Sequence, residues 1–186
     1  MEEHVRREPY DRQLECAADG PGKADRLLLA MIRYDAGDPR RIQHLTKVYE
    51  YARLMGRMER LKNEELEILE AAAIVHDIGI HRAEEKYGRN TGKYQEIEGP
   101  PEAEALLAAQ GWPEAAIRRV SYLVGHHHTY AEIDGMDYQL LVEADFLVNL
   151  YEEGALPETR EDVFRRIFRT ESGKYLFRQM FSRKTE

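Results

Sequence analysis

The chain has 186 residues, of which 42% are hydrophobic and 33% charged, and this size and composition predict one globular domain with its own core. A formal net charge of −8 disfavours general nucleic-acid binding, and no apolar run approaches the ~18 residues of a membrane-spanning helix. The single cysteine, Cys16, excludes an internal disulfide and a cysteine-cluster zinc site, and we expect a cytoplasmic protein without membrane partners. Residues 1–20 are predicted to form a polar arm, and residues 21–186 the domain.

Two helices are predicted after this arm. Apolar residues recur at helical spacing over Lys23–Tyr34, which predicts the first helix. Asp38 and Pro39 are typical of the cap and the first position of a second helix. His44 lies on that second helix, and a lone histidine there is most often an ordinary surface or core residue.

A third helix is predicted to begin after Asn63 and to run from Glu64 to about Ile78, where Gly79 ends it. Its second half, AAAIVHDIG, is apolar nearly all round, which is typical of a helix in the middle of a protein. His76 and Asp77 lie near its end. An ionised carboxylate is costly to bury there without a partner, so the alternative is a helix end that emerges into solvent.

The segment from His81 to Gly99 is rich in charge, glycine and tyrosine, and we predict a long and functional loop. His81 itself is interpreted as an exposed loop residue. Pro100 and Pro101 are then predicted to open a short helix that ends at about Gln110.

Pro113 is predicted to open the next helix, which reaches three consecutive histidines. If the helix extends this far, its 3.6-residue period turns His127 and His128 inward and His126 outward. The alternative is a polar helix cap without a site role. The apolar face that sets this orientation is marked by Ile117, Val120 and Val124.

The last long helix is predicted from Tyr138 to about Tyr151, after a turn at Asp134 and Gly135. Asp145 lies within its apolar stretch LVEADFLVNL, where it needs a cation or several donors, whether it is a ligand or a structural residue. Asn149, one turn later, is suited to orient it. Two shorter helices are predicted near Glu158–Arg169 and Lys174–Phe181, so the whole chain is predicted to be an all-α single domain.

Three of these helices together carry two imidazoles and two carboxylates. This mixed nitrogen and oxygen donor set suits a divalent transition metal such as Mn, Fe, Co, Ni or Zn. Thiolates are absent from the set, and a site with several ligands and room for water is of the catalytic type. The four residues are His44, His76, Asp77 and Asp145.

The order of these residues, with the His-Asp pair inside HDIG, resembles the HD-domain metal-dependent phosphohydrolases. The likeness extends over about Ile32 to Leu150. The stretches KYQEIEGPPEA and GHHHTYAEIDGMDYQLLVEADFLVNL look like an uncharacterised bacterial subgroup of that superfamily. The resemblance implies an HD-type helical bundle, hydrolysis of a phosphate ester, and a divalent metal held by His44, His76, Asp77 and Asp145.

Two branches of that superfamily are relevant. Dinuclear members, including HD-GYP phosphodiesterases, add histidines before the last aspartate, which implies one or two ions here, with Glu98, His127 and His128 as a second metal site or a phosphate site. Ile80 replaces the lysine that usually follows HDIG, and the GYP element is missing, so a cyclic dinucleotide is a poor substrate candidate. Another branch uses a mixed-valent di-iron site to oxygenate a C–H bond with similar ligands, and the sequence leaves that alternative open.

The mechanism that we predict is metal-assisted hydrolysis of a small phosphorylated substrate, such as a nucleotide. Asp77 is expected both to bind the metal and to accept a proton from the attacking water. Three cations after HDIG are the main candidates to bind the phosphate, and Arg40 and Arg41 are weaker ones. Those cations, which are alternatively a solvated charge run, are Lys86, Arg89 and Lys93.

Overall fold

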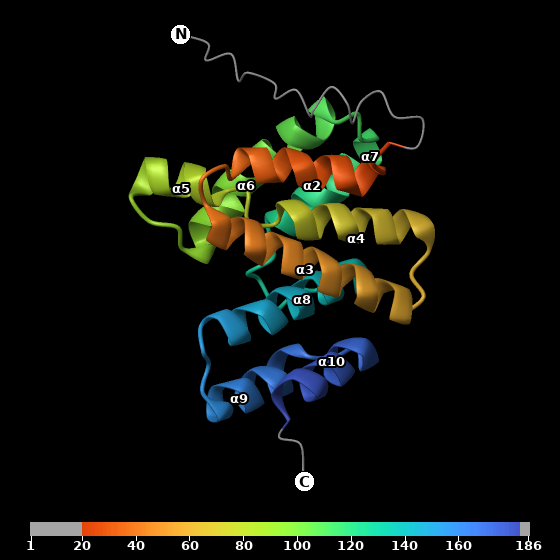
Figure 1. Ribbon diagram of the computed structural model, residues 1–186, viewed down its shortest axis with the longest axis vertical. Coiled ribbons are helices and arrows are strands. Elements are labelled where there is room, and N and C mark those ends of the chain that lie inside the picture. The colour runs from red at the N-terminus through yellow and green to blue at the C-terminus, as the bar shows by residue number, and fades with distance from the viewer. Residues whose placement is uncertain (1–19, 183–186) are drawn as a thin grey trace.

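The computed structural model describes residues 20–182, and every regular element in this range is a helix, so the predicted all-α fold is confirmed (Figure 1). The predicted polar arm falls on residues 1–19, outside the described residues, apart from Gly20. In chain order the helices are α2 (Lys23–Tyr34), α3 (Pro39–Met58), α4 (Asn63–Val75), α5 (Ile80–Tyr87), α6 (Gly92–Ala109), α7 (Glu114–Val124), α8 (Met136–Glu152), α9 (Pro157–Ile167) and α10 (Glu171–Phe181).

Local signals determine where the first two helices begin. α2 has the bounds that its apolar spacing predicts. α3 begins at Pro39, as predicted, and Asp38 Oδ1 accepts a hydrogen bond from the backbone nitrogen of Arg41 at 3.0 Å. This cap satisfies one of the free N–H groups at the start of α3, and it fixes the turn from which Arg41 and His44 project.

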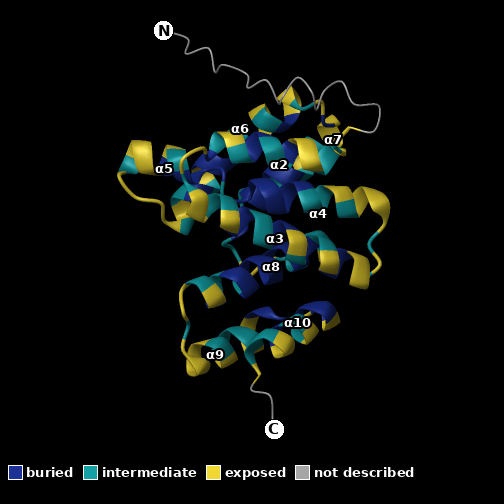
Figure 2. Cartoon of the chain, in the orientation of Figure 1, coloured by how far each residue is buried: buried dark blue, intermediate teal, exposed yellow. Residues whose placement is uncertain are grey.

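α4 is the central helix of the bundle. It packs against α2, α3, α7 and α8, and its residues 71–75 are fully buried (Figure 2). The helix ends at Val75, earlier than the predicted Ile78, so His76 and Asp77 lie in the turn that joins α4 to α5. The turn therefore presents both side chains to the helices that surround α4.

The prediction of a long loop after HDIG is wrong. The segment forms α5 and the first half of α6, and Gly88 ends α5 in the left-handed conformation, with φ at 67°. Pro100 and Pro101 lie inside α6 instead of opening a helix. Proline in a helix interior removes a hydrogen bond, but α6 packs along both α5 and α7, and this tertiary packing outweighs the local cost.

The three consecutive histidines lie just beyond a helix. α7 ends at Val124, and the histidines follow in the turn, so the helical projection does not extend to them as assumed. His127 is nonetheless buried, as predicted, whereas His126 and His128 are partly exposed.

The C-terminal pair α9 and α10 packs on α8 and α3, at the end of the molecule opposite α2 (Figure 1). None of the helices within residues 20–182 is both long and apolar enough to cross a bilayer.

Candidate metal centre

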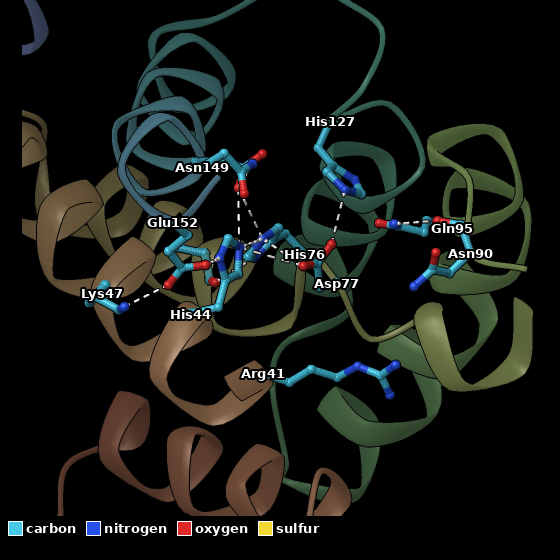
Figure 3. A network of polar contacts seen from close by, with 12 residues as sticks. Arg41, His44, Lys47, His76, Asp77, Asn90, Gln95, His127, Asn149 and Glu152 are labelled. Atoms are coloured by element: carbon cyan, nitrogen blue, oxygen red, sulfur yellow. Dashed lines mark hydrogen bonds and ion pairs between the residues drawn. The ribbon is translucent and has the colours of Figure 1, made fainter. Parts of the chain in front are cut away.

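Four of the predicted ligands converge in the middle of the bundle. His44 projects from α3, and the turn after α4 supplies His76 and Asp77 (Figure 3). Asp145 comes from α8. His44 Nε2 lies 3.3 Å from His76 Nε2 and 3.2 Å from Asp145 Oδ1. Asp77 Oδ2 lies 3.5 Å from His44 Nε2 and 3.4 Å from His76 Nε2.

These distances fit a shared ion. Two ligand atoms bound to one ion at ~2.1 Å lie roughly 3.0 Å apart at right angles and roughly 3.4 Å apart at tetrahedral angles. The donor atoms of His44, His76 and Asp145 form a group that could hold a metal ion, and Asp77 Oδ2 lies at its edge. The residues present therefore fit a divalent cation with nitrogen and oxygen ligands.

Hydrogen bonds on the far side of each ring orient the two histidines. His76 Nδ1 lies 2.9 Å from the carbonyl oxygen of Ala73, which can only accept, so Nδ1 carries the proton. His44 Nδ1 lies 3.0 Å from Glu152 Oε2, and Lys47 donates to the other oxygen of Glu152 at 2.6 Å. Both Nε2 atoms therefore face the centre of the site, which is the arrangement of a metal-binding histidine with an outer partner.

A second group of donors lies on the other side of Asp77. Asp77 Oδ1 lies 3.6 Å from His127 Nε2, and His127 Nδ1 is 2.8 Å from the carbonyl oxygen of Val124. His127 is 1% exposed, and its Nε2 has no hydrogen-bond partner among the described residues. Asp77, His127 and His128 form a second group that could hold an ion, and the two oxygens of Asp77 face different groups.

Gln95 and Gly92 of α6 fix the position of His128. The His128 Nε2 atom lies 3.1 Å from Gln95 Oε1, and the Gln95 amide donates to the carbonyl oxygen of Asn90 at 2.8 Å. A Cβ atom on Gly92 would lie 2.7 Å from the His128 ring, so only glycine leaves room for the ring there. The ring therefore has a defined place beside His127.

The buried charges shift the pKa values in opposite directions. Burial favours the neutral forms, but the charge of Asp77 and the contacts with Asp145 outweigh it and raise the pKa of His76 to about 9. Burial likewise acts against ionised Asp77 and Asp145, but the facing histidines hold the pKa of each well below its ordinary value. Burial and the neighbouring His127 lower the pKa of His128 to about 4. Without an ion, protons on His76 and on His44, whose pKa is also raised, balance the carboxylates.

A pocket of about 480 Å³ opens beside this centre, and His44, Asp77 and Asn149 are among its lining residues. Arg40 and Arg41 also line the pocket, although the sequence made them weaker candidates for phosphate binding than the cations after HDIG. Those three cations are absent from its lining. Lys86 donates to Glu98 at 2.8 Å, Arg89 donates to the Tyr94 hydroxyl at 2.9 Å, and Lys93 is exposed.

Glu98 and His81 have surroundings that the sequence did not predict. Glu98 is bound to Lys86 and to the Tyr87 hydroxyl, and it belongs to neither group of donors. His81 is not an exposed loop residue: it lies on α5, and its Nε2 is 2.8 Å from Oδ1 of the buried Asp35.

Sequence reasoning also missed Glu152, which orients His44. Its signal was present: Asp145, Asn149 and Glu152 are spaced four and three residues apart, which places them on one face of an otherwise apolar helix. Asn149 does donate to Asp145 Oδ1, at 2.9 Å, as its spacing predicts.

Comparison with known proteins agrees with this geometry. The HD domain family matches residues 41–167, more than half of the chain, and the chain belongs to that family. Membership indicates a metal-dependent hydrolase superfamily, and the matched segment includes all the donor residues of both groups. No curated protein and no solved structure matches the chain.

Proposed function

We propose that the protein is a metal-dependent phosphohydrolase that cleaves a phosphate ester of a small molecule. The observation that carries this proposal is the position of Asp77. One carboxylate oxygen faces His44 and His76, the other faces His127, and the same side chain lines the pocket. A water molecule and a phosphate ester in that pocket are therefore within reach of the donor groups.

The proposal includes one or two divalent ions. His44, His76, Asp77 and Asp145 would hold the first, and Asp77, His127 and His128 would hold the second. A bound divalent ion polarises a phosphoryl oxygen and lowers the pKa of water beside it. His127 supports the second position, because a buried nitrogen without a hydrogen bond is costly unless a ligand completes it.

The chain itself supplies orientation, charge and a proton acceptor. The lowered pKa of Asp77 keeps it ionised at neutral pH, and its place in the pocket makes it our candidate to accept a proton from the attacking water. Glu152 and Asn149 fix His44 and Asp145, so the donors are in place before a substrate arrives. Arg40 and Arg41 are the pocket's cations for the non-reacting phosphoryl oxygens.

The size of the pocket favours a small substrate. At about 480 Å³ it falls in the range of small-molecule sites, roughly 300–1,000 Å³. It is large enough for a nucleotide or a similar phosphate ester.

The test compares wild type and Asp77→Asn on a panel of phosphate esters and nucleotides, each with Mn, Fe, Co, Ni or Zn. We expect metal-dependent phosphate release that falls by about 10²–10⁴-fold in Asp77→Asn, because the variant loses a proton acceptor and a charged ligand. Asp162→Asn is the matched control, since Asp162 lies partly exposed on α9, pairs only with Arg165 and Arg166 of its own helix, and is absent from the pocket lining.

Metal content separates the two ion positions in the same experiment. Wild type that binds two ions per chain is expected to bind one after His127→Ala, whereas wild type that binds one ion is expected to keep it. Equal turnover by wild type and Asp77→Asn would overturn the proposal. Absence of phosphate release from every ester, together with oxygen consumption by the iron-loaded protein, would assign the chain to the oxygenase branch instead.

A further inference from the structure

An ion pair between two helices spans the pocket beside the metal centre. Arg41 lies one turn before His44 on α3, and Glu84 lies one turn into α5. Arg41 Nη2 is 2.7 Å from Glu84 Oε1 and 2.8 Å from Oε2. Both side chains line the same pocket as His44 and Asp77, and Figure 3 shows Arg41 extending toward the side of the site where Asn90 lies.

Two further contacts hold the Arg41 guanidinium from its other edges. Nη1 lies 2.9 Å from His81 Nδ1, and Nε lies 3.3 Å from Asp38 Oδ2. Because a guanidinium only donates, His81 Nδ1 is the acceptor, and the protonated His81 Nε2 donates to the buried Asp35 at 2.8 Å. These contacts keep the guanidinium in place if its third partner, Glu84, leaves.

Glu84 is the partner best suited to exchange. Its side chain is 42% exposed, whereas that of Arg41 is 21% exposed, and an exposed ion pair stabilises a fold only slightly. A phosphate group offers arginine the same paired oxygens as a carboxylate and carries more negative charge. Asn90 donates to Glu84 Oε1 at 3.0 Å and also lines the pocket, so departure of Glu84 frees two donors together.

We propose that Glu84 occupies, on Arg41, the position that the phosphate of the substrate takes when it enters and displaces the carboxylate. This inference rests on the proposed function and deepens it, because it names Arg41 as the anchor of the anionic group, with Asn90 as a second donor. Arg40 adds to the attraction, since it lines the pocket and has no ion-pair partner within residues 20–182. The competing explanation is that the ion pair only joins α3 to α5.

The exchange role and the joining role predict different signs for the changes in phosphate affinity. Glu84→Gln and Arg41→Gln remove the same ion pair, so a joining role predicts that both variants lose thermal stability and change phosphate binding alike. An exchange role predicts opposite changes. Calorimetric titration of the metal-loaded protein with inorganic phosphate should show about tenfold tighter binding in Glu84→Gln and about tenfold weaker binding in Arg41→Gln, as expected for a charge-assisted hydrogen bond.

Glu85→Gln is the matched control. Glu85 is the next residue of α5, it is bound to Arg82 at 2.6 Å, and it is absent from the pocket lining. It makes the same change in net charge, so unchanged phosphate affinity in Glu85→Gln excludes a general electrostatic effect. Melting curves of all three variants establish that each is folded.

Unchanged phosphate affinity in Arg41→Gln overturns the role of Arg41 as the anchor. Phosphate affinity that changes in the same direction in Glu84→Gln and Arg41→Gln, or that does not change in Glu84→Gln, overturns the exchange. If wild type still hydrolyses esters in that case, the proposed function stands without it. If no ester is hydrolysed but phosphate binding changes with opposite signs, the anchor stands and the proposed function is overturned.

Discussion

At the scale of single residues, the candidate metal centre is a balance of protons and charges. Asp77 and Asp145 are ionised in the interior, and the facing histidines compensate them. Protons on His44 and His76 thus occupy, in the metal-free chain, the positions that a cation would take. Binding a metal at this site is therefore an exchange of protons for an ion.

This exchange predicts a pH dependence of metal affinity. The pKa of His76 is raised to about 9, so at neutral pH the metal-free chain must release that proton before Nε2 can bind an ion. The apparent affinity should rise with pH by about tenfold per unit for each proton displaced, and level off above the pKa of His76.

Calorimetry in two buffers of different ionisation enthalpy measures this release directly. At least one proton per ion is expected at pH 7. His128 should contribute none, because its pKa is lowered to about 4 and its ring is neutral at that pH. Metal affinity that is unchanged between pH 6 and pH 8 would contradict the prediction.

At the scale of helices, the glycine of HDIG is required by a close approach between α5 and α6. The backbone angles of Gly79, with φ at −71° and ψ at −11°, suit any residue. A Cβ atom there would lie 2.6 Å from the backbone nitrogen of Gly99 and 2.7 Å from the carbonyl oxygen of Gln95. Gly99 in turn leaves room for Val124 at the end of α7.

Gly79→Ala should therefore destabilise the protein by about 1–3 kcal/mol, because backbone atoms of α6 have to move. α6 carries Gln95, so His128 is expected to lose its fixed position in the same variant. Urea unfolding measures the stability. Gly22→Ala is the control, because the added Cβ meets only the flexible side chain of Asp25, at 3.3 Å. Equal stability of Gly79→Ala and wild type would show that α6 shifts without cost.

The sequence predicts an element where contacts between near neighbours form it, and it misses an element that depends on packing against other helices. The start of α3 depends on the cap by Asp38, which contacts a residue only three positions later, so the sequence alone predicts it. α5 and the first half of α6 were missed, because α5 packs against α6, and α6 packs against α7 as well, so their charged and proline-containing segments are held as helices by tertiary packing. Such packing partners belong to other helices and leave no signal within the segment itself.

The candidate site shows the same difference between residues that a local motif identifies and residues that helix packing brings together. The identities of His44, His76, Asp77 and Asp145 followed from their motif, and the structure brings all four together. Partners that depend on how helices pair were not predictable in this way. The phosphate-binding cations were expected after HDIG, but the pocket is lined instead by Arg40 and Arg41, because α3 borders it.

At the scale of the whole molecule, one buried carboxylate joins the C-terminal helices to the rest. Glu143 of α8 is fully buried and accepts hydrogen bonds from the backbone nitrogens of Arg169 and Thr170, at 2.6 and 2.9 Å. The Thr170 hydroxyl and the Gln139 amide also donate to it. α10 then starts directly against this carboxylate, since a Cβ atom on Gly173 would lie 1.9 Å from Glu143 Oε2.

Glu143→Ala should unfold the C-terminal end more readily than the metal centre. The substitution leaves the buried backbone N–H of Thr170 and the partly buried N–H of Arg169 without their acceptor, and since a buried group left unpaired costs about 1–3 kcal/mol, a total loss of about 3 kcal/mol is expected. Glu143→Gln keeps one carbonyl acceptor and should lose less. Hydrogen exchange is the measurement, because protection should fall in α9 and α10 first, while the turn that carries His76 and Asp77 stays protected by α4. Uniform loss of protection along the chain would show instead that α9 and α10 fold and unfold as one unit with the helices around the metal centre.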